Sequence, residues 1–293
     1  MQLAGAITAL VTPFKNGSID EEAYRQLIEW QIEEGIDGLV PCGTTGESAT
    51  LSHEEHEKVI SICIDQVKKR VPVIAGAGSN NTAEAINLLR FAKKAGADAG
   101  LMITPYYNKP TMEGVFQHFK AIAAEVTLPM VVYNVPGRTG SNVTAQCMAR
   151  MVKEIPTVVA AKEASGNIVQ ISDYMELCGP KFSLLVGDDF VVLPAMAMGC
   201  KGVISVSSNI APRLMHEQCQ AFFDGDMAKA RDIHYKMAPI NRACFLETNP
   251  GPVKTALAIM GKIPNGEMRL PMVPISQENE KALRNILAES KLI

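Results

Sequence analysis

The sequence predicts an α/β protein, a (β/α)8 TIM barrel followed by a small C-terminal helical appendage. Over the first 224 residues, short apolar and β-branched runs alternate with amphipathic stretches. There are eight such pairs, one roughly every 25–35 residues, which is the length of a βα unit. Nearly all the unusual polar residues come just after a strand, and a barrel brings the loops after its strands to one face.

The predicted strands are 5–12, 38–42, 72–77, 99–104, 130–134, 158–163, 183–187 and 202–207. Continuous apolar runs of this length are typical of parallel strands that are buried on both faces. The predicted helices between them are 20–34, 53–69, 82–94, 112–125, 144–154, 168–177, 190–198 and 212–223. Ser52-His53-Glu54-Glu55 predicts a capping box, and Gly96 and Gly199 predict helix ends.

The alternating pattern stops after about residue 224, and this predicts the domain organisation. Further helices are expected at 227–243, 253–260 and 278–289, separated by joints rich in Pro and Gly. We therefore expect a catalytic barrel over 1–224 and a helical domain with a structural role over 225–293. An open, doubly wound sheet is the alternative fold, but it would spread the polar loops along an edge.

Composition excludes several classes of protein. The chain has 293 residues, 47% of them hydrophobic, and a net charge of −3 without a basic stripe, so no nucleic-acid partner is expected. Its 7 cysteines form no CxxC pair, which favours reduced thiols in the cytoplasm. No apolar run reaches the ~18 residues of a membrane helix. Residues 1–5 lack the basic start of a signal peptide, so neither export nor a membrane association is expected.

Lys162 is the most informative residue, because it ends the apolar run Val158-Val159-Ala160-Ala161. A lysine in a buried strand is costly unless it is paired or used. Burial lowers the pKa of a lysine, and a neutral amine can attack a carbonyl to form a Schiff base. The alternative is a structural ion pair, for which Glu163 is the nearest acid in the sequence.

Three more features follow predicted strands. The run Gly43-Thr44-Thr45-Gly46-Glu47 can present hydroxyl and N–H groups to a carboxylate, or can be a tight turn. Tyr133, on the strand before that of Lys162, is either a general acid/base or a core tyrosine. Arg138, in a Gly-rich loop, either grips a substrate carboxylate or pairs at the surface.

These runs together resemble a known family. Gly43–Glu47, the run Tyr133-Asn134-Val135-Pro136-Gly137-Arg138-Thr139-Gly140 and Lys162-Glu163 are similar to the signatures of the pyruvate-dependent class I aldolases of the N-acetylneuraminate lyase superfamily. The resemblance extends from about residue 5 to the C-terminus. Within the superfamily the chain looks most like the dihydrodipicolinate synthases, because the N-acetylneuraminate lyases lack the run around Arg138.

The resemblance implies a reaction. Lys162 is expected to form an imine with pyruvate, and the derived enamine is expected to add to L-aspartate 4-semialdehyde, giving 4-hydroxy-tetrahydrodipicolinate in lysine and diaminopimelate biosynthesis. No metal or cofactor is implied, because the protonated imine is the electron sink. The alternatives are another Schiff-base lyase, acting on sialic acid or a keto-deoxy sugar acid, and a non-catalytic barrel that keeps the pocket.

The resemblance also implies roles for individual residues. The catalytic residues are expected to be Lys162, Tyr133, Thr44 and Tyr107. The substrate-binding residues are expected to be Thr45, Arg138, Gly187 and Ile204. Tyr107 is expected to come from a neighbouring subunit of a homotetramer that is a dimer of dimers. A regulatory L-lysine site is expected at Ser48, Ala49, His53, His56, Asn80, Glu84 and Tyr106.

Some residues have less specific interpretations. His53 and His56 lie one helical turn apart, but without a third ligand we expect solvated histidines or part of the lysine site, and no metal. Asp188 and Asp189 suggest a magnesium site as one alternative, but adjacent carboxylates at a strand end are expected rather to cap the following helix. Lys109, Lys201 and Lys254 are rival nucleophiles, each beside Pro or Gly, and we expect them to be solvated.

One run departs from the family pattern. Many relatives read Asn-Pro-Ile-Pro-Val-Lys where this chain has Asn249-Pro250-Gly251-Pro252-Val253-Lys254. We expect the glycine at 251 to affect local stiffness only, without touching the catalytic residues.

Overall fold

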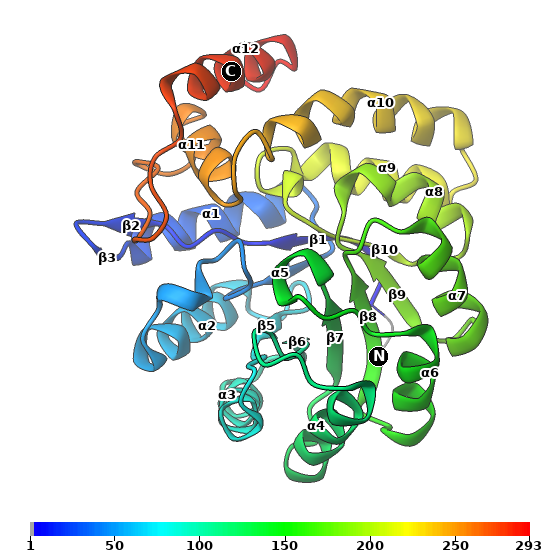
Figure 1. Cartoon of the computed structure of the whole chain (residues 1–293). Coiled ribbons are helices and arrows are strands. Elements are labelled where there is room, and N and C mark those ends of the chain that lie inside the picture. Colours follow the sequence, from blue (N-terminus) through cyan, green and yellow to red (C-terminus); the bar gives the residue numbers. More distant parts are fainter. Residues whose placement is uncertain (1–2) are drawn as a thin grey trace. The chain divides into compact units, whose positions relative to one another are not determined.

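The structure is a computed structural model that describes residues 3–293. Eight parallel strands form one sheet in the order β4-β1-β10-β9-β8-β7-β6-β5 (Figure 1). Leu39 in β4 also forms a parallel bridge with Val73, the residue before β5. Because helices alternate with these strands, the fold is the predicted (β/α)8 barrel, followed by C-terminal helices.

The described residues divide into two compact units. The first unit comprises residues 3–5 and 74–204. Its elements are β5 (Ile74–Gly76), α3 (Thr82–Ala95), β6 (Ala99–Ile103), α4 (Met112–Glu125), β7 (Met130–Asn134), α5 (Pro136–Thr139), α6 (Ala145–Glu154), β8 (Val158–Glu163), α7 (Ile168–Cys178), β9 (Ser183–Val186), η2 (Asp189–Val191), α8 (Val192–Ala197) and most of β10 (Gly202–Ser205).

The second unit comprises residues 6–73 and 205–293. Its elements are most of β1 (Gly5–Ala9), β2 (Phe14–Lys15), β3 (Ser18–Ile19), α1 (Glu21–Glu33), β4 (Gly38–Val40), η1 (Ser48–Thr50), α2 (His53–Val67), η3 (Ser207–Asn209), α9 (Pro212–Phe223), α10 (Met227–Ala243), α11 (Gly251–Ile259) and α12 (Gln277–Glu289). The predicted domain boundary at residue 224 stays a prediction.

The core of the first unit is built by β7, β8 and β9, which lie side by side (Figure 1). Met130, Val131 and Val132 in β7 are fully buried, as are Ala160 and Ala161 in β8. Continuous burial of this kind is what the apolar runs predict for parallel strands with both faces covered. A polar side chain at the ends of these strands is therefore held by rigid neighbours.

Sequence signals for helix ends are confirmed. Ser52 and Glu55 form the predicted capping box at the start of α2, and Gly96 ends α3 in the left-handed conformation with φ 98°. Asp188 accepts a hydrogen bond from the Phe190 N–H, as a cap does, whereas Asp189, also predicted as a cap, is the first residue inside the turn that follows. The predicted helix 190–198 is a 3₁₀ turn, η2, followed by the short helix α8.

Several short elements were not predicted. The hairpin of β2 and β3 turns at Asn16 and Gly17, whose φ values are 54° and 77°. Asn-Gly is the usual pair for such a turn, so the signal was present in the sequence. The helix α5 is a single turn of four residues. Among residues 3–293, no helix is both long and apolar enough to cross a bilayer.

Candidate active site

Lys162 lies in β8, next to Tyr133 in β7. The two residues are Cα partners in the parallel ladder. Lys162 is 5% exposed, and its Nζ lies 4.5 Å from the centroid of the Tyr133 ring. Both side chains are thus buried and in reach of each other, and the prediction that places them on adjacent strands is confirmed.

The alternative that Glu163 pairs with Lys162 is wrong. Successive side chains of a strand point to opposite faces, so Glu163 faces away from Lys162. The Glu163 carboxylate accepts hydrogen bonds from Asn134 Nδ2 at 2.8 Å, from the Ser165 N–H at 2.8 Å and from Gln170 Nε2 at 3.2 Å. No ion pair joins Lys162 to a carboxylate anywhere in residues 3–293.

Gly187, just after β9, makes room for the lysine. A Cβ added at residue 187 would lie 2.6 Å from Lys162 Cε, 3.1 Å from Lys162 Cγ and 2.7 Å from Ala164 Cβ. The Gly187 N–H donates to the Glu163 carbonyl at 2.7 Å, which fixes this backbone against β8. The absence of a side chain at 187 therefore decides where the lysine stem can lie.

Arg138 lies on the single-turn helix α5, directly after β7, and its side chain is exposed. The loop that carries it is tied at both ends by Asn134. The Asn134 Oδ1 accepts from the Val143 N–H at 3.0 Å, and its Nδ2 donates to Asn142 Oδ1 at 2.9 Å as well as to Glu163. One buried amide thus connects the arginine loop with the strand of Lys162.

Tyr107 protrudes from the loop after β6. It is 89% exposed, with φ 70°. Nearby in the same unit, Asn80 Nδ2 donates to the Tyr106 carbonyl at 3.0 Å, and Ser79 Oγ forms a hydrogen bond with the Glu84 carboxylate. The structure therefore brings Asn80 and Tyr106 of the predicted regulatory set together. Ile204, predicted to bind substrate, is fully buried in β10.

In the second unit, residues 43–47 form a tight turn. The Gly46 N–H donates to the Gly43 carbonyl and the Glu47 N–H to the Thr44 carbonyl, both at 3.1 Å. Thr44 is half-buried and Thr45 is buried. Because Thr45 Oγ1 accepts a hydrogen bond from Asn249 Nδ2 at 3.0 Å, its own proton is available for another acceptor.

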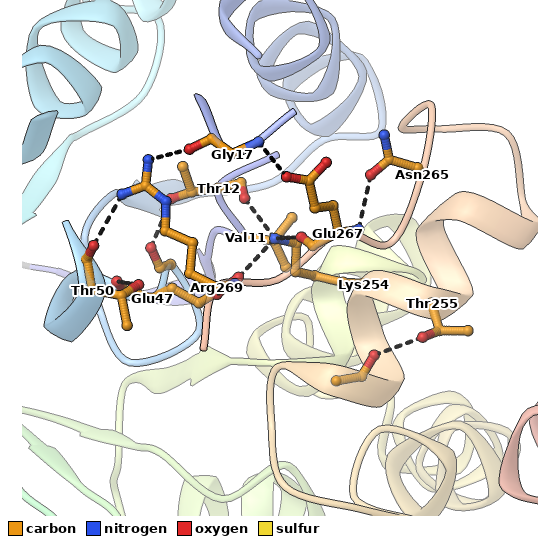
Figure 2. Close-up of polar contacts among 12 residues, drawn as sticks. Val11, Thr12, Gly17, Glu47, Thr50, Lys254, Thr255, Asn265, Glu267 and Arg269 are labelled. Carbon is orange, nitrogen blue, oxygen red and sulfur yellow. Dashed lines mark hydrogen bonds and ion pairs between the residues drawn. The ribbon is translucent and has the colours of Figure 1, made fainter. Parts of the chain in front are cut away.

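The prediction that Lys254 is solvated is wrong. Its side chain is 0% exposed, and its Nζ donates to Glu47 Oε1 at 2.7 Å, to the Thr12 carbonyl at 2.8 Å and to the Glu267 carbonyl (Figure 2). Burial lowers the pKa of Lys254 from its ordinary value, and the Glu47 carboxylate acts in the opposite direction. Because the Lys254 amino group donates hydrogen bonds to three acceptors, it is an ammonium group with all three protons in use.

The other two rival lysines differ in exposure. Lys109 is exposed, as predicted, and Lys201 is half-buried. The side chain of Lys109 passes close to Gly140, where an added Cβ would lie 2.6 Å from Lys109 Cε. Neither lysine has the buried strand position of Lys162.

The remaining predicted regulatory residues lie in the second unit. Ser48 and Ala49 are in η1, and His53 and His56 begin α2. His53 is exposed, but His56 is only 7% exposed, so the interpretation of solvated histidines is wrong for His56. Within the described residues there is no group of three or more His, Cys, Asp or Glu side chains that could hold a metal ion.

All seven cysteines lie in the described part of the chain, and none of them forms a disulfide. Burial raises the pKa of Cys63 and Cys200 to about 12 and that of Cys178 to about 11. These thiols stay protonated near neutral pH and are poor nucleophiles. The nucleophile is therefore better sought among the lysines.

The hydrogen-bond networks described above contain three polar residues whose partners were not predicted from the sequence. They are Asn134, Asn249 and Lys254. Asn134 lies in a run that carries the family resemblance, and Asn249 lies in the run that departs from the family pattern at residue 251. No local pattern indicates the hydrogen-bond partners that each of them has.

Comparison with known proteins agrees with this geometry. The model of the Dihydrodipicolinate synthetase family matches residues 2–290. The chain is 63% identical, over the full length of both chains, to the 4-hydroxy-tetrahydrodipicolinate synthase of Nitratidesulfovibrio vulgaris (strain DSM 19637 / Miyazaki F).

Two solved structures are similar over nearly the whole chain. The chloride-inhibited dihydrodipicolinate synthase of Acinetobacter baumannii complexed with pyruvate is 44% identical, with a TM-score of 0.97 over 100% of each chain. The enzyme of Cyanidioschyzon merolae with lysine bound is 39% identical, with a TM-score of 0.96 over 99% of each chain. The predicted family is confirmed: the chain belongs to the dihydrodipicolinate synthetase family.

Proposed function

We propose that this chain catalyses the Schiff-base condensation of pyruvate with L-aspartate 4-semialdehyde to 4-hydroxy-tetrahydrodipicolinate, the first committed step of lysine and diaminopimelate biosynthesis. The observation that carries the proposal is a buried lysine at the end of β8, packed on a tyrosine ring and not paired with a carboxylate of residues 3–293. The full-length relative at 63% identity carries the name of this activity.

The reaction begins at Lys162. Its amine attacks the ketone carbon of pyruvate, and loss of water leaves a protonated imine. Loss of a methyl proton gives the enamine, whose carbon adds to the aldehyde of the semialdehyde. The amino group of the second substrate then closes the ring at the imine carbon and releases the free lysine. The imine nitrogen accepts the electron pair, so we propose that no cofactor takes part.

Proton transfer needs a hydroxyl group beside the lysine. The Tyr133 ring is the aromatic group under Lys162 Nζ, so we assign this phenol the role of general acid and base. We assign Thr44 and Tyr107 to the same relay. The 89% exposure of Tyr107 supports its donation to a second subunit, since a tyrosine with so few contacts in its own chain is free to reach another.

Substrate binding is assigned to four positions. Thr45 offers a hydroxyl proton to the carboxylate of pyruvate, because its oxygen already accepts from Asn249. The backbones of Gly187 and Ile204 line the keto acid. Arg138, exposed on α5, holds the carboxylate of the semialdehyde through its planar guanidinium.

We further propose a cytoplasmic homotetramer, built as a dimer of dimers and regulated by L-lysine. The seven cysteines, none of them in a disulfide, support a reducing compartment. The hydrogen bond from Asn80 to the Tyr106 carbonyl supports a preformed part of an effector site. The Cyanidioschyzon merolae protein with lysine bound supports L-lysine as the effector. Light scattering at several protein concentrations measures the assembly.

The decisive experiment is reduction with borohydride in the presence of pyruvate. We expect one reduced pyruvyl group per chain, located on Lys162 by peptide mass mapping, and none in Lys162→Met. Label on Lys109 or Lys201, or no label, defeats the mechanism. A two-substrate assay with L-aspartate 4-semialdehyde, run with and without L-lysine, then tests the second substrate and the regulation.

A further inference from the structure

The turn at residues 43–47 is held by the segment from Asn249 to Arg269, which follows the eight βα units. We propose that Asn249 and Lys254 are positioning residues that aim the Thr45 hydroxyl proton at the carboxylate of the keto acid. This inference rests on the proposed function. It assigns to this segment a role in substrate binding, beyond the structural role predicted from the sequence.

Asn249 fixes the direction of the Thr45 hydroxyl. The amide Nδ2 donates to Thr45 Oγ1 at 3.0 Å, and both residues are buried. A threonine hydroxyl has one proton and two lone pairs, so a hydroxyl that accepts from Asn249 has to donate elsewhere. An aspartate at 249 would accept that proton instead, and its charge would repel a bound carboxylate.

Lys254 fixes the backbone of the same turn. Its ammonium group binds the Glu47 carboxylate and the Thr12 carbonyl (Figure 2), while the Thr12 hydroxyl donates to the Gly46 carbonyl at 2.8 Å. Glu47 has φ 55°, a conformation that side chains other than glycine rarely adopt and that needs support from its surroundings. Lys254 thus binds Glu47 directly and is linked to Gly46 through Thr12, so it fixes the turn at both residues.

Arg269 completes the attachment of Glu47. The Arg269 N–H donates to Glu47 Oε2 at 3.1 Å, so both carboxylate oxygens of Glu47 are bound by the C-terminal segment. The Arg269 guanidinium pairs with both oxygens of Glu55 at 2.6 Å. Because both of its oxygens are bound, the Glu47 side chain has one orientation. This fixes the backbone of the turn that carries Thr44 and Thr45.

A double-mutant cycle tests the role of Asn249. We measure borohydride trapping of the pyruvate imine as a function of pyruvate concentration in wild type, Asn249→Asp, Thr45→Val and the double variant. We expect each single variant to raise half-saturating pyruvate about 10-fold or more, as loss of a hydrogen bond to a charged group does, with little change in the saturated rate. Because both single variants remove the same proton donation, their two effects should combine in the double variant to clearly less than their product.

The outcomes separate the two proposals. Effects of Asn249→Asp and Thr45→Val that multiply in the double variant, or an unchanged Asn249→Asp, overturn the inference and leave the proposed function standing. Wild-type protein that traps no pyruvate on Lys162 overturns both. Asn87→Asp adds the same charge at an exposed asparagine and should behave as wild type. Asn249→Ala replaces Asn249→Asp if the latter does not fold, with the same criterion.

A second set of variants tests Lys254. Lys254→Met leaves Glu47 buried without its cation, so it is paired with Glu47→Leu in a double variant that removes both charges. We expect the double variant to fold but to keep half-saturating pyruvate raised about 10-fold, because the turn has lost its attachment. Wild-type pyruvate binding in the double variant overturns the positioning role. Lys281→Met, at an exposed lysine of α12, is the matched control.

Discussion

Replacing Gly187 by alanine tests whether the space beside Lys162 decides the chemistry. The new Cβ would lie 2.6 Å from Lys162 Cε and 2.7 Å from Ala164 Cβ. Carbon atoms in contact are normally about 3.5–4.0 Å apart, so each contact is short by about 1 Å. The end of the Lys162 side chain can rotate away from the new Cβ. The Lys162 Cγ, at 3.1 Å from that Cβ, and the Ala164 Cβ lie close to the backbone and can move less.

We expect this overlap to lower both the stability and the rate of imine formation. Overpacking in a filled core costs about 1–3 kcal/mol, and we expect Gly187→Ala to lower the Tm by several degrees. A nucleophile displaced by about 1 Å can lose roughly 100-fold in rate, and we expect that loss in the formation of the pyruvate imine. The assay is a quenched-flow time course of borohydride trapping, read by intact mass, with a thermal melt of the same samples.

Gly137→Ala is the control for a glycine-to-alanine change as such. A Cβ at 137 meets no atom within 4 Å, and this glycine has no positive φ. We expect the Gly137→Ala protein to form the imine at the wild-type rate. Imine formation in Gly187→Ala within twofold of wild type, with an unchanged Tm, would refute the steric reasoning.

Three further predictions concern the second substrate and the response to pH. Arg138→Ala should leave pyruvate trapping intact but lower kcat/KM for the semialdehyde by about 100-fold, measured in the two-substrate assay. Burial lowers the pKa of His118 from 6.5 to about 4, so its stabilising contribution is complete above pH 6.5 and is lost as the pH falls to 4. Urea unfolding should show a loss of about 2–3 kcal/mol over that range, absent in His118→Gln. The Arg269 guanidinium lowers the pKa of Glu55 to about 2. The free energy of unfolding, measured with urea, should therefore fall by about 1–2 kcal/mol as the pH falls from 4.5 towards 2. Arg269→Met should not show this loss.

The fold could be predicted because apolar runs and capping residues are local signals. The run of β8 is continuous and apolar, and Ser52 with Glu55 makes a capping box within four residues. Strand ends were less certain. The predicted strand 5–12 stops at Ala9, because the Val11 N–H turns to the Asn209 side chain at 3.1 Å. A partner nearly 200 residues away leaves no trace in a local pattern.

The candidate site could be predicted in part for the same reason. Lys162 and Tyr133 follow from strand order alone, since consecutive βα units place their strands side by side. The partner of Glu163 does not follow from strand order. The choice between Lys162 and Asn134 depends on the face of β8 from which each side chain projects. Burial of Lys254 was missed because Pro and Gly in its neighbourhood indicated a solvated joint.

The two buried lysines differ in the way that their proposed roles, nucleophile for Lys162 and structural cation for Lys254, require. Both follow small or apolar residues, and both lie over an aromatic ring, Lys162 at 4.5 Å from the Tyr133 centroid and Lys254 at 4.3 Å from that of Phe14. Lys254 donates to a carboxylate and two carbonyls, and an amine whose three protons are all donated has no lone pair for a carbonyl carbon.

Lys162 is also buried, but it has no carboxylate partner in the described chain, so no ion pair holds its amino group. Burial alone therefore does not distinguish the proposed nucleophile from a structural cation, whereas the set of acceptors around each amino group does. It follows that the Lys254→Met, Glu47→Leu protein should still trap pyruvate on Lys162 alone once pyruvate is saturating.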